Sequence, residues 1–315
     1  MANELMTNEL MNQSTNNILM IRPVNFGYNA QTAESNAFQT KQADQQAVQQ
    51  KAVAEFDGFV AVLRDNGVNV TVISDTPEPH TPDSIFPNNW VSFHDTGDII
   101  LYPMQAQNRR LERREDIIRQ LEENFAAKHL VDLSRFEAKN QFLEGTGSMV
   151  LDRENKIAYA CLSPRTDAEV LQAFCDYTGY KAVTFDAFDE KGKAIYHTNV
   201  LMCVGSKFAV ICLDSITDLY QKLAVIQSLK STGKEVIEIT FEQMNQFAGN
   251  MLEVKNAQGE TLIVMSQTAY GSLTDAQRSA LSVFGKLVYA DIGTIEINGG
   301  GSARCMMAEV HLAEV

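Results

Sequence analysis

The sequence predicts an α/β protein: a five-fold pseudosymmetric α/β propeller of ββαβ-type repeats, closed by pairing of the N- and C-terminal strands. Three observations support this fold class. Apolar hairpins recur along the chain at nearly regular spacing, each is followed by an amphipathic helix and a short strand, and each end of the chain carries a strand without a partner nearby in sequence. Repeated units of this size bury their apolar faces against one another, so a stacked or closed architecture is expected.

The hairpins are the clearest sign of the repeat. Each combines two apolar, β-prone runs with a polar turn such as DTGD, DRENK, VGSK or KNAQGE. They span residues 90–104, 148–163, 199–215 and 250–266. From Asn89 to Ser148, Asn199, Asn250 and Cys305, the successive steps are 59, 51, 51 and 55 residues. The repeat is thus nearly constant in length.

A helix and a strand follow each hairpin. Apolar residues at helical spacing predict helices at 109–125, 167–177 and 218–229, and another after the capping residue Thr274. Short strands are expected at 129–133, 182–185, 235–240 and 287–290. The fifth repeat is divided between the termini: 305–312 supplies one strand, and 17–26, 46–66 and 68–73 supply a strand, a helix and a strand. Pairing of the terminal strands would complete the ring and leave few exposed sheet edges.

The alternative fold is a doubly wound parallel sheet in which the hairpins are coincidental. That fold explains neither the regular spacing nor the unpaired terminal strands. Its phosphate loop is also missing, because the glycine run at 298–302 (NGGGS) is not followed by a predicted helix. The repeat architecture is therefore preferred.

Composition indicates the domain organisation and the partners. Residues 18–315 are expected to form a single domain after a polar, disordered tail at 1–17. The net charge of −14 disfavours nucleic acids and anionic membranes as partners. Five cysteines without metal-site spacing or a secretory leader indicate reduced thiols and a cytoplasmic location. No apolar run approaches the roughly 20 residues that span a bilayer. A homodimer is the default expectation for a soluble enzyme.

Polar residues gather immediately before the hairpins. Equivalent loops in a ring of repeats lie on one face near its axis, so we expect these side chains to converge on a central cavity. In chain order they are Asp83, Asn88, Asn89, Glu144, His197, Asn199, Asn250, Arg304 and Cys305. A thiol beside an imidazole is the nucleophile-and-base arrangement of covalent catalysis. The two carboxylates suit a planar group with several N–H donors, such as guanidinium or ureido.

Each of these residues has an ordinary structural explanation when it is considered alone. A cysteine after a glycine run is more often structural than catalytic, and His197 would be a hydrogen-bonded core histidine. Asp83 would be a turn former, and Glu144 a surface acid. The other four cysteines lie in apolar patterns and are interpreted as small hydrophobic residues. Recurrence at equivalent positions of the repeat favours the functional interpretation.

The same segments resemble a known enzyme family. PDSIFPNNW (82–90) resembles the PDSxF-type motif of dimethylarginine dimethylaminohydrolases, and LEGTGS (143–148) the glutamate-glycine motif of arginine deiminases and amidinotransferases. YHTN (196–199) is similar to their catalytic histidine motif, and GGGSARCMMAEVHL (299–312) to their cysteine motif. LSPRT, around Arg165, resembles a carboxylate-binding segment of the dimethylarginine hydrolases. The resemblance runs from 18 to 312 and implies the guanidine-modifying superfamily, whose five-fold ring is the pentein fold.

Two further motifs, IRPVNFGYN (21–29) and FPNNW (86–90), contribute to a closer likeness within this superfamily. Through them the sequence most resembles bacterial amidinotransferase-like proteins described as citrulline-utilisation hydrolases. Two positions depart from the motifs of other members. Asn199 stands where arginine deiminases and glycine amidinotransferases carry an acid, and Asn89 where dimethylarginine hydrolases carry one. A carboxamide in place of a carboxylate removes negative charge and adds a donor. A neutral ureido oxygen gains a partner by this change, whereas a cationic guanidinium loses one.

The resemblance therefore implies a hydrolase acting on linear C–N bonds, without a metal or organic cofactor. Its expected substrate is citrulline, split into ornithine, CO2 and ammonia through a covalent adduct on Cys305. His197 would protonate the leaving amine and then activate water. Asp83 and Glu144 would hold the N–H groups of the substrate, and Glu144 would also orient His197.

The remaining candidates are substrate-binding residues. Three amides, Asn89, Asn199 and Asn250, are expected to line the site. Arg165, with Arg304 or Arg22 as alternatives, is expected to bind an α-carboxylate. The proline-rich segment 75–85 is a candidate lid.

Two other functions stay open at this point. One is a different enzyme of the same superfamily, either an arginine- or agmatine-type deiminase or an amidinotransferase. The other is a non-catalytic pentein that only binds a partner. The complete set of aspartate, glutamate, histidine and cysteine argues against the second function, and the acidity of the chain argues against RNA as its partner.

Overall fold

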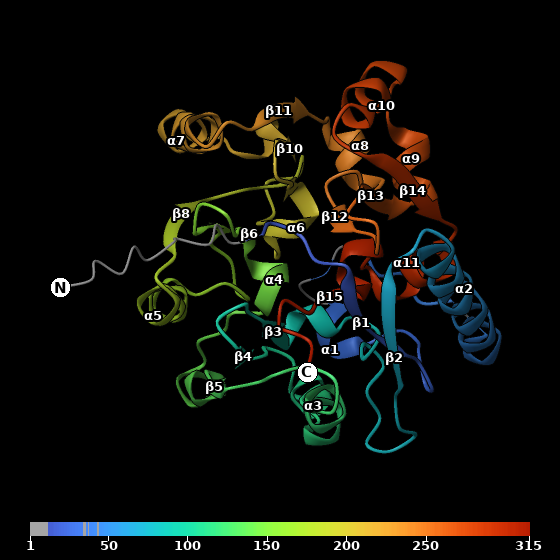
Figure 1. The fold of residues 1–315 in the computed structure, drawn as a ribbon. Helices are drawn as coiled ribbons and strands as arrows, with labels where there is room; N and C mark the ends of the chain where they lie inside the picture. The colour runs from blue at the N-terminus through green and yellow to red at the C-terminus, as the bar shows by residue number, and fades with distance from the viewer. Residues whose placement is uncertain (1–11, 34–35, 37, 43) are drawn as a thin grey trace.

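The strands form five separate three-stranded sheets in the computed structural model, which describes residues 12–33, 36, 38–42 and 44–315. Figure 1 shows the sheets distributed around the middle of the molecule. In every sheet the central strand pairs antiparallel with one neighbour and parallel with the other. No single closed sheet is present among the described residues. The sheets, each with its central strand in second place, are β15 (Ala308–Glu309), β1 (Asn17–Arg22) and β2 (Asn69–Ser74); β3 (Val91–Phe93), β4 (Asp98–Leu101) and β5 (His129–Asp132); β6 (Val150–Asp152), β7 (Ile157–Cys161) and β8 (Lys181–Phe185); β9 (Met202–Val204), β10 (Phe208–Ile211) and β11 (Glu235–Glu238); and β12 (Leu252–Lys255), β13 (Thr261–Ser266) and β14 (Lys286–Ala290).

The two ends of the chain meet in one sheet. Strand β15 pairs antiparallel with β1, placing Ile18 opposite Glu309 and Leu19 opposite Ala308. The predicted pairing of the terminal strands is confirmed. The C-terminal strand is shorter than expected, because residues Ala303–Met306 form a 3-10 turn (η5) before it. Cys305 therefore lies in a turn and not in the ladder of the sheet.

One helix of eight or more residues lies between the two parallel strands of each sheet, and parallel pairs need such a crossover connection. These crossover helices are α2 (Gln45–Asp65), α3 (Glu115–Glu122), α5 (Ala168–Thr178), α7 (Leu219–Ser231) and α10 (Asp275–Ser282). Their apolar faces cover the sheets; α2, for example, buries Val48, Phe56 and Leu63. The predicted cap Thr274 forms a capping box with Gln277. None of the helices in the described ranges combines the length and apolarity needed to cross a bilayer.

The helix predicted at 109–125 is divided into two pieces. A 3-10 helix, η2 (Gln107–Glu112), comes first, and α3 begins only at Glu115. The division follows from burial, because Arg109 and Glu112 pair with each other inside the protein while α3 buries Ile117, Ile118 and Leu121. A continuous amphipathic helix would not turn both sets inward.

Short helical segments occupy the middle of the molecule. Helix α4 (Gly145–Ser148) packs against α6 (Thr198–Leu201) and against the 3-10 turn η1 (Pro87–Asn89), and η1 packs against η5. Figure 1 shows α4 and α6 between the sheets. These segments carry the polar residues that precede the hairpins, so the predicted convergence of those loops is observed. The other short segments are α1 (Ala30–Ala33), α8 (Phe241–Asn245), α9 (Gln267–Ser272), α11 (Gly293–Gly299), η3 (Ser134–Lys139) and η4 (Leu213–Ser215).

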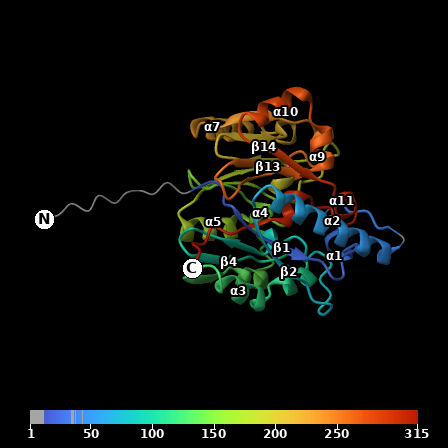
Figure 2. The ribbon, with the colours of Figure 1, turned by 45° about the vertical axis from the view of Figure 1, so that its right-hand side comes forward.

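Helix α11 leads the chain from the outside towards the centre. It packs against α2 on one side, and both views place the two helices side by side (Figures 1 and 2). A glycine run, Gly299–Gly301, continues from its C-terminal end towards Cys305. A Cβ atom at Gly299 or Gly301 would lie within 2.9 Å of the Phe86 ring, so only glycine allows this close approach.

The segment before β1 is held by contacts, in contrast to the expected disordered tail at 1–17. Residues 1–11 lie outside the described residues, but Gln13 is buried and links three chain segments. Its Nε2 donates to the carbonyls of Leu151 (2.9 Å) and Val204 (3.1 Å), and its Oε1 accepts from the amide of Arg153 (2.7 Å). Residues just before the predicted boundary are therefore held in place by the protein. Composition failed to indicate this because hydrogen bonds of Gln13, Ser14 and Thr15, and not an apolar pattern, fix the segment.

Replacing Gln13 with alanine is expected to lower the free energy of unfolding by about 2–3 kcal/mol, since it leaves buried backbone groups without partners. Urea denaturation measures the change. We expect the slope of the free energy of unfolding against urea concentration to be the same as in the wild type. Gln172→Ala, an exposed position on α5, is the matched control, and we expect it to cost less than about 0.5 kcal/mol. Equal effects of the two substitutions would contradict a structural role for Gln13.

Candidate active site

The thiol of Cys305 lies between two carboxamides. Its Sγ is 3.4 Å from Nδ2 of Asn199 and 3.3 Å from Nδ2 of Asn250, and only 6% of the residue is exposed. The Asn250 amide is fixed from both sides, because its Nδ2 also donates to the Asn199 carbonyl (2.9 Å) and its Oδ1 accepts from the Arg304 amide (3.0 Å). The sulfur also lies 3.7 Å from Oδ1 of Asn250, so both carboxamides hold the thiol in place. Asn199 and Asn250, expected beside the substrate, thus contact the nucleophile.

His197 and Glu144 form a buried hydrogen-bonded pair. His197 immediately precedes α6, Glu144 immediately precedes α4, and Nε2 of the imidazole lies 2.8 Å from Oε2 of the carboxylate. The other oxygen of Glu144 accepts from the backbone amide of Gln105 (3.0 Å), and Arg165 approaches Oε2 at 3.4 Å. Both oxygens of Glu144 are therefore engaged by protein groups. This geometry suits a residue that orients the imidazole better than one that holds the substrate.

The charges of this pair follow from burial and from the neighbouring cations. Burial lowers the pKa of His197 to about 4, although Glu144 acts in the opposite direction. Burial alone would raise the pKa of Glu144, but Arg165, His197 and Arg109 together hold it well below the usual range. At neutral pH the Glu144 carboxylate is charged, and it accepts a hydrogen bond from the protonated Nε2 of a neutral imidazole. Nδ1 of His197 then carries a lone pair and is available as a base.

The lowered pKa of His197 predicts that it contributes to acid destabilisation. The unfolded chain binds a proton at this histidine below about pH 6.5, whereas the folded chain does so only near pH 4. Its contribution to stability is therefore complete above pH 6.5 and is lost as the pH falls towards 4. Between pH 7.5 and pH 5 the loss is on the order of 2 kcal/mol.

Urea unfolding of the wild type and of His197→Gln at both pH values measures this contribution. We expect the change from pH 7.5 to pH 5 to lower the free energy of unfolding of the wild type by about 2 kcal/mol more than that of His197→Gln. The comparison is needed because Glu112, whose pKa is raised to about 7 by burial, titrates in the same window with the opposite sign. A difference that does not change with pH would contradict the buried, neutral state of His197.

One carboxylate oxygen of Asp83 accepts hydrogen bonds from described residues, and the other accepts none. Its Oδ2 accepts from Nδ2 of Asn29 (2.7 Å) and from the Thr32 hydroxyl (3.1 Å), and it lies 3.8 Å from Nε of Arg109. Its Oδ1 is buried and has no hydrogen-bond partner among the described residues. Burial raises the pKa of Asp83, against the influence of Arg109, Asn29 and Thr32. Oδ1 is thus an acceptor that a ligand N–H can reach without displacing a protein donor.

The amides of Asn88 and Asn89 show the same pattern. Asn89 Oδ1 accepts from Nη1 of Arg109 (2.8 Å), whereas its Nδ2 is buried without a partner in the described part of the chain. Asn88 donates to the Thr146 hydroxyl (3.3 Å) and leaves its own Oδ1 unpaired among those residues. A Cβ at Gly147 would lie 2.4 Å from Asn89 Nδ2 and 2.8 Å from His197 Nδ1. Glycine at 147 therefore brings these two nitrogen atoms over the same point of α4.

Arg109 and Glu112 belong to this cluster, although no sequence motif indicates them. Arg109 binds both oxygens of Glu112 at 2.9 Å and also donates to Asn89, so it ties η2 to η1. Asn29 and Thr32 are further members of the cluster. Asn29 ends the motif IRPVNFGYN, which carries the family resemblance without indicating a role for this residue. Arg109 appears only as one charge in an amphipathic pattern, and Thr32 has no motif of its own.

A covering segment, defined as residues 29–33, 36 and 38–40, lies over the glycine run and Asp83. Besides the contacts of Asn29 and Thr32, Asn36 donates to the carbonyls of Gly299 and Gly300, each at 3.3 Å. Thr40 donates from its amide to the carbonyl of Ile297 (2.7 Å). The candidate lid or rim at 75–85 carries Asp83, and it is folded on itself, since Thr81 and Ser84 both donate to Asp75.

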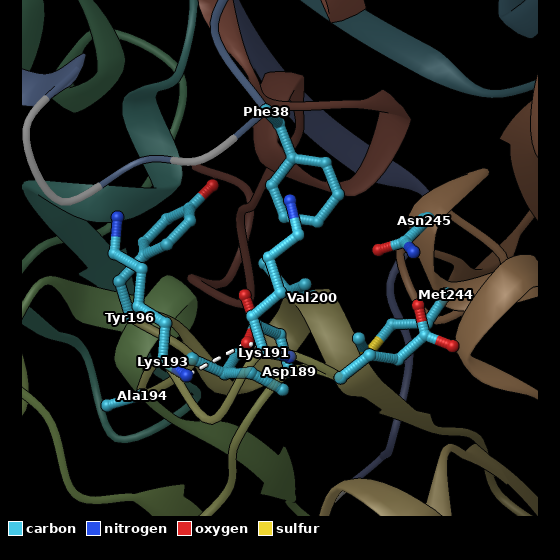
Figure 3. Close-up of a pocket in the computed structure, with 11 residues that line it drawn as sticks. Phe38, Asp189, Lys191, Lys193, Ala194, Tyr196, Val200, Met244 and Asn245 are labelled. Atoms are coloured by element: carbon cyan, nitrogen blue, oxygen red, sulfur yellow. Dashed lines mark hydrogen bonds between the residues drawn. The ribbon is translucent and has the colours of Figure 1, made fainter.

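Arg165 lies at the edge of the site beneath the covering segment. Its guanidinium donates to Oε2 of Glu144 (3.4 Å) and to the carbonyl of Thr32 (2.9 Å), and it stacks 4.8 Å from the centre of the Tyr196 ring. Two cavities flank Tyr196. Gln31, Gln105, Gln107, Pro164, Lys193, Ala194 and Tyr196 line the first, of 660 Å³. The second, of 290 Å³, is bordered by Phe38 of the covering segment, Tyr196, Val200 and Met244 (Figure 3). Cys305 lines neither cavity.

Two of the predicted carboxylate-binding arginines lie elsewhere. Arg304 donates to the Met307 carbonyl (2.9 Å) and to Glu309 Oε2 (2.5 Å). Its guanidinium therefore turns away from the thiol, because neighbouring residues in a turn project in different directions. Arg22 pairs with Asp57 at the surface. Of the three arginines, the structure brings only Arg165 to the cluster.

The other four cysteines are structural, as expected. All are buried, and burial raises the pKa to about 12 for Cys161 and Cys203 and to about 11 for Cys175 and Cys212. No group of three or more histidine, cysteine or acidic side chains that could hold a metal ion occurs among the described residues.

Comparisons with known proteins agree with this fold. The chain is similar in structure to ArgZ, an arginine dihydrolase from the ornithine-ammonia cycle in cyanobacteria, with a TM-score of 0.74 and 16% identity over 95% of this chain. The match covers 41% of the ArgZ chain, so the present chain spans less than half of that protein. Against the product-bound N-terminal domain of ArgZ, the TM-score is 0.71 and the identity 16%, covering 93% of this chain and 97% of that domain.

A third similar structure is a dimethylarginine dimethylaminohydrolase adduct with S-methyl-L-thiocitrulline, with a TM-score of 0.63 and 15% identity over 93% of this chain and 98% of that one. No curated protein matches the chain. The family model described as N,N dimethylarginine dimethylhydrolase, eukaryotic, matches residues 22–312. Since that match covers nearly the whole chain, the protein belongs to this family and, with it, to the pentein superfamily.

Proposed function

We propose that the protein is a cysteine-dependent hydrolase that attacks the ureido carbon of citrulline and releases ornithine, CO2 and ammonia. One observation carries the proposal: the Cys305 thiol lies between two amide donors, in a buried cluster that also contains a paired imidazole and carboxylate. A nucleophile, a base and a group that orients the base are the requirements of covalent catalysis. ArgZ and the dimethylarginine hydrolase support an enzyme acting on guanidino groups.

The polar atoms without partners favour a ureido group. Asp83 Oδ1 and Asn88 Oδ1 are acceptors for N–H groups, and Asn89 Nδ2 is a donor for an oxygen. A ureido group offers both N–H and C=O, whereas a guanidinium offers only N–H. The donor at Asn89 would face an N–H of a guanidinium, and that repulsion disfavours arginine. Binding would occupy all three buried atoms and remove the cost of leaving them unpaired.

The reaction proceeds in two steps. His197 Nδ1 takes the thiol proton, and the Cys305 thiolate attacks the ureido carbon to form a C–S bond. The imidazolium then returns the proton to the δ-nitrogen, which leaves as ornithine while the carbon stays on sulfur as an S-carbamoyl group. Water, deprotonated by His197, attacks that carbon, and the C–S bond breaks to regenerate the thiol. The carbamate released decomposes to CO2 and ammonia, so one water is consumed per citrulline.

The amino-acid end of the substrate requires a route out of the buried cluster. We place it in the 660 Å³ cavity, which adjoins the site at Tyr196, at Gln105 beside Glu144, and at Pro164 beside Arg165. Arg165 remains the partner for the α-carboxylate, in exchange for its contact with the Thr32 carbonyl. Admission of the substrate then requires the covering segment to move.

At the level of the fold, we propose that the five sheets form a five-fold propeller whose ring is closed by the β1–β15 pair. Identical strand order and a crossover helix of eight or more residues in each sheet support this arrangement. The homodimer and the cytoplasmic location stay predictions.

A second candidate is hydrolysis of arginine. Asp83 and Glu144 lie in the same cluster, and two carboxylates favour a cation over a neutral group. Product analysis separates the candidates: purified protein is incubated with L-citrulline, L-arginine or asymmetric dimethylarginine, and the products are quantified. We expect ornithine and ammonia from citrulline. Citrulline formed from arginine or dimethylarginine would indicate a deiminase-type enzyme instead. Ornithine formed from arginine would indicate the second candidate, hydrolysis of arginine.

A further inference from the structure

A small polar cavity lies behind the candidate nucleophile. It has a volume of about 20 Å³ and is lined by two arginines, one glutamate and two amide side chains among apolar residues. The polar members are Gln13, Arg153, Asn199, Arg304 and Glu309. A cavity of this size accommodates one water molecule when two or more polar partners face it. Gln13 joins the backbones of Leu151, Arg153 and Val204 at this cavity.

Asn199 connects this cavity to Cys305. Its Nδ2 contacts Cys305 Sγ at 3.4 Å, whereas its Oδ1 is buried and accepts no hydrogen bond from any described residue. An amide group has two nearly isosteric orientations. In the observed orientation an N–H faces the sulfur; rotated by half a turn, the oxygen would face it and repel a thiolate. A donor to Oδ1 is therefore needed to hold the orientation that presents an N–H to the sulfur.

Arg153 has buried donor atoms without hydrogen-bond partners among the described residues. It is only 2% exposed, yet its Nε and Nη1 make no hydrogen bonds within the described residues. Its charge is balanced by Glu309, whose Oε1 lies 3.5 Å from Nε, and Glu309 is bound in addition by Arg304 at 2.5 Å. Unpaired donors of Arg153 and an unpaired acceptor of Asn199 thus belong to residues that line the same cavity.

We propose that this cavity binds one structural water molecule, which accepts a hydrogen bond from Arg153 and donates one to Asn199 Oδ1. Arg153 is then a positioning residue for the nucleophile, acting through the water and Asn199 from behind the thiol. The water would satisfy both buried groups, each of which otherwise costs about 1–3 kcal/mol. This inference rests on the proposed role of Cys305 and adds a determinant of its reactivity.

The test compares Arg153→Met with the wild type, Asn199→Ala and the double variant. Methionine fills the space without donating, and Glu309 keeps Arg304 as its partner, so no buried charge is left alone. The rate of Cys305 alkylation by iodoacetamide is measured against pH by mass spectrometry of the Cys305 peptide, together with kcat and KM. Alkylation needs no substrate, so it tests the positioning role even if the proposed reaction is wrong.

We expect Arg153→Met to reduce kcat and the alkylation rate at pH 7 about tenfold, which is the value of one well-oriented hydrogen bond to a charged group, and to change KM less than twofold. In the Asn199→Ala background the same substitution should have less than a twofold effect. Arg153→Lys, which returns an N–H donor, should restore at least half of the lost rate. Val170→Ala, a core truncation on α5, should lower stability and leave the alkylation profile unchanged.

Independent, multiplicative effects of the Arg153 and Asn199 substitutions would overturn the proposal. So would a folded Arg153→Met protein with the wild-type alkylation profile. A crystal structure resolving ordered water should place one molecule within hydrogen-bond distance of both Arg153 and Asn199 Oδ1, and a dry cavity there would also overturn it.

Discussion

Replacement of Cys305 by alanine is expected to lower turnover of the preferred substrate by at least about 10⁴-fold, because it removes the sulfur that forms the covalent intermediate. The other thiols in the chain cannot substitute, since each is buried and burial raises its pKa to about 11 or 12. Initial rates of ornithine formation measure the effect. Alanine removes the hydrogen-bond contacts of the thiol with the Asn199 and Asn250 amides and keeps an apolar side chain within the core cluster to which Cys305 belongs.

Cys175→Ala is the matched control for this experiment. It removes a thiol from α5 at a distance from the cluster, and we expect its turnover to stay within about twofold of the wild type. Circular dichroism and urea unfolding must show that both variants are folded. Retention of more than a tenth of the activity by Cys305→Ala would contradict the role of Cys305.

Replacement of Glu144 by glutamine is expected to lower kcat by about 10³-fold and to change KM only slightly. Glutamine keeps the shape of the side chain but removes the charge that stabilises the imidazolium during proton transfer. Steady-state kinetics with the preferred substrate measure both constants. The ratio of the two effects distinguishes the two roles that the sequence suggested for Glu144, because a residue that holds the substrate would raise KM.

Glu137→Gln provides the control for Glu144→Gln. Glu137 also accepts a backbone amide, that of Met104 at 2.9 Å, and also pairs with an arginine, Arg113 at 2.6 Å, but it contacts none of the proposed catalytic residues. We expect it to lose stability and to retain kcat within about twofold. A large increase in KM for Glu144→Gln with an unchanged kcat would indicate that Glu144 binds the substrate and does not orient His197.

Much of the architecture was predictable because it repeats. Alternating apolar runs fix a hairpin locally, and the same pattern at nearly constant steps identifies equivalent positions without knowledge of the contacts between them. The unpaired strand at 17–22 required a partner, and the pairing of Ile18 with Glu309 supplies it. For the same reason the motif residues Asp83, Glu144, His197 and Cys305 could be assigned to one cluster.

The direction of individual side chains was not predictable. Arg304 precedes Cys305 directly, yet its guanidinium pairs with Glu309, whereas the Cys305 thiol contacts Asn199 and Asn250. Asn199 and Asn250 were placed beside the substrate, and only three-dimensional contacts place them against the sulfur. A sequence position indicates which loop a residue occupies, but not which face of the loop carries its side chain.

Contacts made by single polar residues also escape pattern analysis. Arg109 ties η2 to Asn89 and to Glu112 through hydrogen bonds that have no periodic signature. Gln13 holds the N-terminal segment by one amide in a stretch whose composition indicates a disordered tail. Asn29 and Thr32 reach Asp83 from a segment more than 50 residues earlier in the chain.

The central claim is that the substrate carbon becomes bonded to Cys305 during turnover. Rapid mixing of the enzyme with excess citrulline, acid quenching and peptide mass spectrometry test it most directly. The account predicts a carbamoyl group on the Cys305 peptide, formed as fast as turnover and absent from Cys305→Ala. Steady turnover without any modification of Cys305, or an adduct on another cysteine, would contradict it.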